Sequence, residues 1–196
     1  MTSSNTTNEN LVKILQQFTE QYIAQYQKIH ACLPTVEQDE EWPSPCEQKA
    51  TENSSLPRDK VFWQPSAIEK SEELSFENVE SALDFTLHND IKTYFTLLYS
   101  ESIDAHCDEG ELSLLFAWNK NDFGRLQENL IGHILMKRRL KQKETIFFAV
   151  TDEEDMIISV DNASGEVWVE RVGCIPHKQL SDSLAQFISQ LTPVIK

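Results

Sequence analysis

An amphipathic stretch from Trp118 to Lys141 lies between two apolar runs, LSLLFAW at 112–118 and TIFFAV at 145–150, and constrains the fold most. Either Asn119 or Asn121 can cap a helix here, because a short side-chain oxygen accepts from the free N–H groups of the first turn. The apolar side chains recur at helical spacing and predict its buried face: Phe123, Leu126, Leu130, Ile131, Ile134 and Leu135. We therefore expect strand, helix, strand, with the helix packed on the sheet.

Gly132 and His133 lie in the middle of this predicted helix. A mid-helix glycine costs about 1 kcal/mol relative to alanine, so we expect a neighbouring element to approach closely at Gly132. We expect His133 to be hydrogen-bonded at the edge of the core rather than to act in catalysis or bind a metal. Basic residues end the stretch, and cations suit the negative end of a helix: Lys137, Arg138, Arg139 and Lys141.

The remaining pattern predicts an α+β fold with a largely antiparallel sheet, since most strands are linked as hairpins. We expect a disordered tail at 1–8 and a single domain over 9–196. Helices are expected from a cap at Asn8 to before Pro34, at 79–85, at 89–99 and around 180–191, with loop over 33–60. Strands are expected at 61–63, at 103–107 as an edge strand, and at 111–118, 145–151, 156–161 and 166–170.

The formal net charge of −15 narrows the range of partners. It argues against nucleic acid and against direct adsorption on an anionic membrane, and it favours a basic protein. Residues 61–118 hold twelve acidic and two basic residues, whereas residues 119–145 hold three acidic and seven basic residues. No signal peptide or membrane-spanning run is evident, so we expect a cytosolic chain whose cysteines are reduced.

Catalytic, cofactor and metal motifs are missing from the sequence. It has no nucleophile elbow, phosphate-binding loop, dinucleotide fingerprint or zinc-ligand spacing, so we predict no cofactor and no metal. One alternative is a cysteine hydrolase that uses Cys107 with His106 or His133. Neighbours in a strand point to opposite faces, which disfavours the pair His106–Cys107.

Two acidic turns carry the stronger functional signal. The first set flanks the turn between the strands predicted at 103–107 and 111–118 and consists of Asp104, Asp108, Glu109 and Glu111. The second set forms the turn between the strands predicted at 145–151 and 156–161 and consists of Asp152, Glu153, Glu154 and Asp155. If both turns lie at one end of the sheet, they focus a negative potential over a small area. We predict that these acids bind a basic partner. An immunity-like protein that neutralises a basic toxin fits the charge equally well.

Four motifs give the chain a family resemblance: PSPC at 43–46, FWQP at 62–65, QENLIGHI at 127–134 and ISVDNASGEV at 158–167. In this order and spacing the chain resembles the Syd family, the SecY-interacting proteins of gamma-proteobacteria, from about Phe18 to Leu191. It departs from that family in a longer polar N-terminus and in inserted residues around 47–60.

The resemblance implies a non-enzymatic protein held loosely at the cytoplasmic face of the inner membrane through SecY. It implies a check on, or negative regulation of, uncomplexed or abnormal SecY, through a concave electronegative groove. Cytoplasmic loops of membrane proteins are rich in Lys and Arg, so the charge pattern points to the same kind of partner. We expect a monomer whose basic helix end, Lys137 to Lys143, faces away from the groove.

Overall fold

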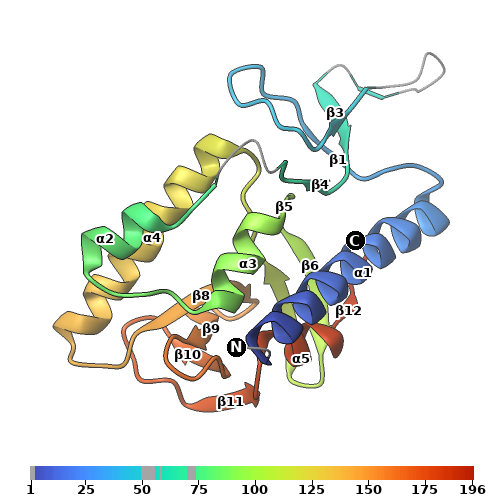
Figure 1. Ribbon diagram of the computed structural model, residues 1–196. Helices are drawn as coiled ribbons and strands as arrows, with labels where there is room; N and C mark the ends of the chain where they lie inside the picture. Colours follow the sequence, from blue (N-terminus) through green and yellow to red (C-terminus); the bar gives the residue numbers. More distant parts are fainter. Residues whose placement is uncertain (1–2, 50–55, 58, 70–73) are drawn as a thin grey trace.

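The computed structural model describes residues 3–49, 56–57, 59–69 and 74–196 (Figure 1). Its main feature is a curled antiparallel sheet, which confirms the α+β prediction. The strands lie in the order β11 (Lys178–Ser181), β10 (Val167–Arg171), β9 (Met156–Asp161), β8 (Thr145–Thr151), β7 (Gly110–Leu114), β6 (Ile103–Cys107) and β12 (Thr192–Pro193). The predicted bounds of β6, β8 and β9 are confirmed. The edge position of β6 is wrong, because the short strand β12 pairs with it.

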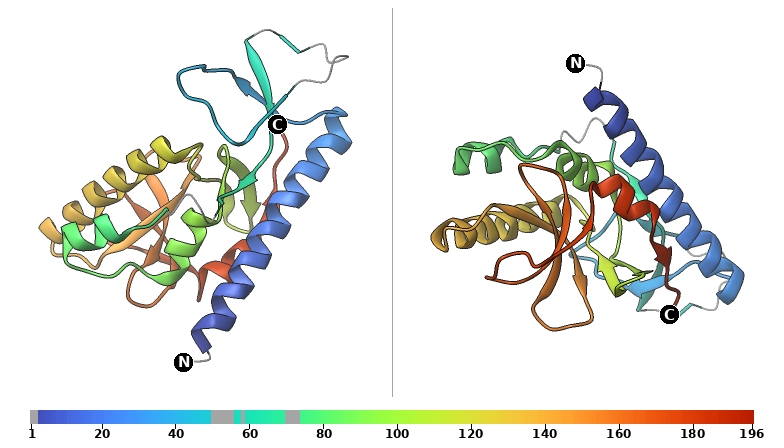
Figure 2. Two further views of the ribbon diagram at one scale, coloured as in Figure 1. Left: turned by 45° about the horizontal axis from the view of Figure 1, so that its top comes forward. Right: turned by 90° about the horizontal axis from the view of Figure 1, so that it is seen from below.

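The helices lie on both sides of this sheet. They are α1 (Ser3–His30), α2 (Glu77–Leu83), α3 (Asn89–Leu97), α4 (Lys120–Arg139) and α5 (Leu184–Ser189). Tyr94 of α3 and Phe187 of α5 pack edge-on against Phe148 of β8. Helix α1 runs beside α3 and α5, whereas α4 lies across the sheet from α1 (Figure 2, right).

Helix α1 is longer than its sequence pattern suggests. It begins at Ser3, so Asn8 lies within the helix rather than capping it. Residues 3–8, which the sequence predicts to be a disordered tail, form its first turns. Its apolar side chains Leu11, Leu15, Phe18 and Tyr22 are buried where α1 packs against α3 and α5, whereas Ile29 on the same stripe is 63% exposed.

Helix α4 begins as predicted, with the Asn119 side chain accepting a hydrogen bond from the Asp122 N–H. Its buried face, however, is rotated from the predicted one. Leu126 and Ile131 are only partly buried and Leu135 is 49% exposed. Their places are taken by three buried polar residues: Gln127, His133 and Lys137. Apolar spacing alone misses this face because each of these side chains has specific hydrogen-bond partners.

A small sheet joins the strand predicted at 61–63 to two short strands within the region predicted to be loop. Its order is β1 (Thr35–Glu37), β3 (Lys60–Trp63) and β2 (Glu47–Gln48), while residues 50–55 and 58 lie outside the described part of the chain. A separate pair joins β4 (Ser66–Ala67) to β5 (Leu98–Tyr99). The Ser44 hydroxyl donates to the Trp118 carbonyl, and Asn119 donates to the Pro43 carbonyl at 2.9 Å. The PSPC motif thus ties the small sheet to the start of α4.

The ISVDNASGEV motif is also structural, because it builds the β9–β10 hairpin. Asp161 accepts from the N–H groups of Ala163 and Ser164. Gly165 has φ +81°, and a Cβ there would lie 2.7 Å from the His88 ring. A glycine is therefore required for both conformation and space.

Asn119→Ala is expected to lower the free energy of unfolding by about 1–2 kcal/mol, because it removes the α4 cap and the bond to Pro43. Denaturant unfolding measures the change. Asn121→Ala is the matched control, since Asn121 is exposed and caps nothing. Equal losses for both variants would contradict this assignment.

Candidate functional site

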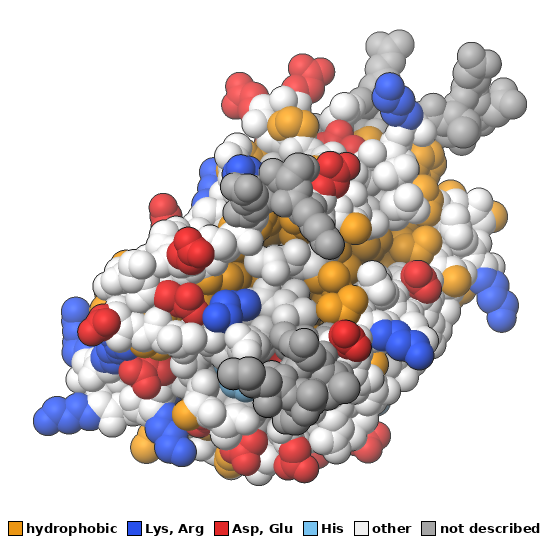
Figure 3. All heavy atoms as spheres, viewed as in Figure 1, with side chains coloured by type: hydrophobic (Ala, Val, Ile, Leu, Met, Phe, Trp, Pro, Cys, Tyr) orange, Lys and Arg blue, Asp and Glu red, His pale blue; other side chains and the backbone are white. Residues whose placement is uncertain are grey.

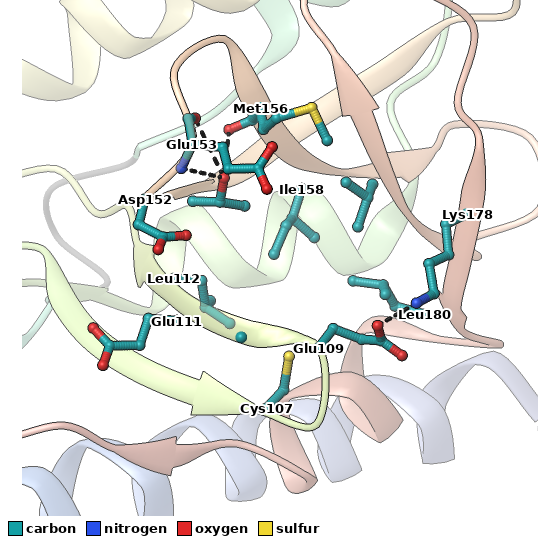
Figure 4. A pocket seen from close by; sticks show the side chains of 13 residues that line it. Cys107, Glu109, Glu111, Leu112, Asp152, Glu153, Met156, Ile158, Lys178 and Leu180 are labelled. Carbon is teal, nitrogen blue, oxygen red and sulfur yellow. Dashed lines mark hydrogen bonds and ion pairs between the residues drawn. The ribbon is translucent and has the colours of Figure 1, made fainter.

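Both acidic turns lie at the same end of the sheet. Leu112 of β7 pairs with Thr151 of β8, so the β6–β7 turn and the β8–β9 turn are adjacent. Together with β11 they surround one hollow (Figure 4), which we call the acidic hollow. Four of the predicted acids line it: Glu109, Glu111, Asp152 and Glu153. All four are exposed, whereas Leu112 and Ile158 in the same hollow are buried.

The other predicted acids are placed differently. Asp108 lines a neighbouring hollow that shares Glu109 and Cys107 with the first. Glu154 and Asp155 are exposed on the β8–β9 turn but do not line the acidic hollow. Asp104 lies further along β6, opposite Ser113 of β7. Hence the structure brings together four of the eight residues, with Asp104 and Asp108 beside them.

Asp104 extends the acidic surface from the acidic hollow along the strands β6 and β7. Partial burial pushes the pKa of Asp104 upward, but hydrogen bonds from Lys196 and Ser113 outweigh it and hold that pKa below its usual value. The Lys196 ammonium lies 2.8 Å from Asp104 and 4.0 Å from Glu111. Asp104 raises the pKa of Lys196 most, and Glu111 and Asp152 add to it. We call these three carboxylates, which act on one cation, the acidic strip: Asp104, Glu111 and Asp152.

A second cation closes the rim of the acidic hollow. Lys178 of the edge strand β11 forms an ion pair with Glu109 in the β6–β7 turn, so it links strands that are not neighbours in the sheet (Figure 4). The sequence did not reveal β11 or this pair, because residues 178–181 lack an apolar alternation. Asp104, which is partly buried, and Glu109, which is exposed, thus already hold ammonium groups of the chain itself.

The structure adds acids that sequence reasoning missed. Burial raises the pKa of Glu101, and the nearby Asp122 carboxylate raises it further. Burial also raises the pKa of Tyr22 to about 12, with added contributions from Tyr26, Asp104 and Glu101. Negative charge therefore extends from the acidic strip toward the start of α4. The sequence carried no signal for this, since Glu101 lies between two predicted elements.

The residues of the hydrolase alternative are not assembled. Cys107 lines the acidic hollow, whereas His133 Nε2 lies 3.1 Å from Thr145 Oγ1 and 3.6 Å from Glu170 beneath α4. His106 is exposed and follows the strand alternation away from Cys107. The prediction that His133 is hydrogen-bonded at the edge of the core is confirmed.

The basic end of α4 differs from the prediction at its first residue. Lys137 is fully buried, forms an ion pair with the fully buried Glu170, and donates to the Cys174 carbonyl at 2.8 Å. Glu170 also accepts from Thr145 at 2.6 Å. Burial tends to raise the pKa of Glu170, but His133, Lys137 and Thr145 together hold it below its usual value. Lys and Arg side chains gather at the lower left of Figure 3, over the C-terminal end of α4.

Comparison with known proteins decides the family. The family model described as Syd protein (SUKH-2) matches residues 12–193. The chain belongs to the Syd family. Protein Syd of Colwellia psychrerythraea is 61% identical, over 95% of this chain and 94% of the relative. Protein Syd of Pseudoalteromonas atlantica is 42% identical, over 97% of each chain, and that of Pectobacterium atrosepticum is 38% identical, over 94% and 97%.

The family motifs can now be placed on this member of the Syd family. PSPC and ISVDNASGEV build the small-sheet junction and the β9–β10 hairpin, and QENLIGHI provides buried Gln127 and His133. No helix in the described ranges is long and apolar enough to cross a membrane.

Proposed function

We propose that this Syd family member is a non-enzymatic protein that binds basic cytoplasmic loops of the SecY channel at its acidic hollow and acidic strip. The observation that carries the proposal is the convergence of two separate acidic turns at one end of the sheet. Exposed carboxylates from both turns line one hollow. Such a surface complements loops enriched in Lys and Arg.

The charge of the whole chain explains how binding and location are linked. A net charge of −15 repels anionic lipid, so contact with the membrane depends on the protein partner. The same charge speeds encounters with a basic partner. Within this proposal the protein is a monomer that reaches the cytoplasmic side of the inner membrane through SecY and checks SecY that is uncomplexed or abnormal.

Affinity for SecY is expected to fall about tenfold or more between low salt and roughly 0.5 M salt. At the higher concentration, salt screens the attraction between exposed charges that are more than a few ångströms apart. Titration of SecY in nanodiscs against the protein across a salt series measures this dependence. Circular dichroism in the same buffers confirms that the fold is unchanged. An affinity that is constant across the series rules out the electrostatic mechanism.

A further inference from the structure

The inference rests on the proposed function and concerns a second hollow beside the acidic strip. We infer that this hollow receives a bulky apolar side chain of the same basic segment that the strip binds. We call it the apolar hollow, and it is lined by Gly132 and Met136 of α4, Phe147 and Val150 of β8, Ile157 of β9, and Val172. Its volume is about 350 Å³. That is near the lower end of roughly 300–1,000 Å³ for ligand pockets, which suits one side chain rather than a larger ligand.

The strand register places the two sites on one face of the sheet. Asp104 pairs with Ser113, Ser113 with Val150, and Val150 with Ile157. Residues directly opposite each other point to the same face, and neighbouring strands are about 4.8 Å apart. Along this row of paired side chains, the acid Asp104 on β6 is separated from the apolar Val150 on β8 by two strand spacings, or roughly 10 Å. A short extended segment spans that distance with a few residues.

Gly132 gives the apolar hollow its room. We expected a neighbouring element to require this glycine, and that expectation is wrong: Gly132 is exposed and a Cβ there would meet nothing within 4 Å. Its cost to helix stability is about 1 kcal/mol and brings no packing benefit within the described chain. Gly132 forms part of the rim of the hollow, on the side of α4 away from its buried residues. The space left by this glycine is thus available to a side chain from outside.

The chemistry of the lining selects an apolar group. His133, the polar residue of the wall, has its Nε2 engaged with Thr145 and lies edge-on to Phe147 at 5.4 Å. Val172 is 45% exposed, and Leu135 and Leu140 on α4 are 49% and 47% exposed. Of these, Val172 lines the hollow, and an exposed apolar side chain at the wall of a largely apolar hollow is typical of an interaction site. The acidic strip beside it supplies the complementary charge, so the occupant is a basic segment with an adjacent Leu, Phe or Trp.

Two short peptides test this inference. One carries several Lys and Arg residues with a single Trp, and the other has Ser in place of that Trp. The Trp peptide is expected to bind the full-length protein about tenfold tighter or more, because its ring is removed from water in the hollow. Gly132→Leu places a bulky side chain at the rim and is expected to obstruct the hollow and remove the difference, while both peptides keep their salt dependence. Fluorescence anisotropy measures all four affinities.

Gly124→Leu is the matched control, because Gly124 lies on the same helix, a Cβ added there would also meet nothing within 4 Å, and it does not line the hollow. It should preserve the tenfold difference. If thermal unfolding shows that Gly132→Leu is misfolded, Val172→Ser at the exposed wall replaces it, with the same expected loss. Equal affinity of both peptides for the native protein overturns the inference and leaves the proposed function standing. If neither peptide binds, both the inference and the proposed function are overturned. If the protein instead binds anionic vesicles or a second copy of the chain in a way that depends on Gly132, the inference alone is overturned.

Discussion

Glu170→Gln is expected to lower the free energy of unfolding by about 3–5 kcal/mol, because it leaves the Lys137 ammonium buried without a counter-charge. Both side chains are fully buried in the structure. The remaining partners of Lys137 are the Cys174 carbonyl and the Gln142 amide oxygen, and neither carries a charge. Denaturant unfolding followed by circular dichroism measures the loss.

The double variant Lys137→Met/Glu170→Leu is the control. Replacing both charges by apolar groups of similar size removes the unpaired ion, so most of the loss should be recovered. If Glu170→Gln alone unfolds the protein, recovery in the double variant still tests the mechanism. A double variant that is less stable than the single one would contradict it.

The same ion pair makes stability depend on pH. The pKa of Glu170 lies below its ordinary value of 4.5, so its ionised form stabilises the fold at neutral pH. That contribution is fully present above the pKa of the unfolded chain and is lost as pH falls through the folded pKa. Between pH 6 and pH 3 the native protein should therefore lose more unfolding free energy than the double variant.

The hairpins were predictable because their signals are local. Strands β8 and β9 alternate or run apolar between turn residues, and Gly165 marks the β9–β10 turn by its need for positive φ. The start of α4 was predictable to within two residues for the same reason, since Asn119 and Asn121 were both candidate caps and the structure uses Asn119. By contrast, β12 and β11 are short and have no apolar pattern, so only their partners in the sheet define them.

The candidate site was predictable in composition but not in arrangement. Acid density singled out the two turns, but whether they meet depends on the register between β7 and β8, which the sequence does not specify. The buried face of α4 depends on pairs that are distant in sequence, such as Lys137 with Glu170. The apolar hollow likewise joins Gly132 to Val172, and no local pattern connects them.

Charge reversal at the acidic strip is the second large expected effect. Glu111→Lys/Asp152→Lys should weaken SecY binding by about tenfold to a hundredfold, because two attractive contacts become repulsive. Both residues line the acidic hollow and are exposed, so the fold should tolerate the change. Binding to SecY in nanodiscs near 0.15 M salt measures the loss, and thermal unfolding confirms the fold.

The matched control is Glu40→Lys/Glu128→Lys, which makes the same change in net charge at two exposed acids outside both acidic turns and outside the acidic hollow. Because exposed charges more than about 8 Å from a bound segment are largely screened at this salt, its affinity should change less than about threefold. Equal losses in both double variants would mean that net charge, rather than the acidic strip, drives binding. Unchanged affinity in both would place the SecY contact elsewhere on the molecule. Only a loss confined to Glu111 and Asp152 supports recognition by the converging turns.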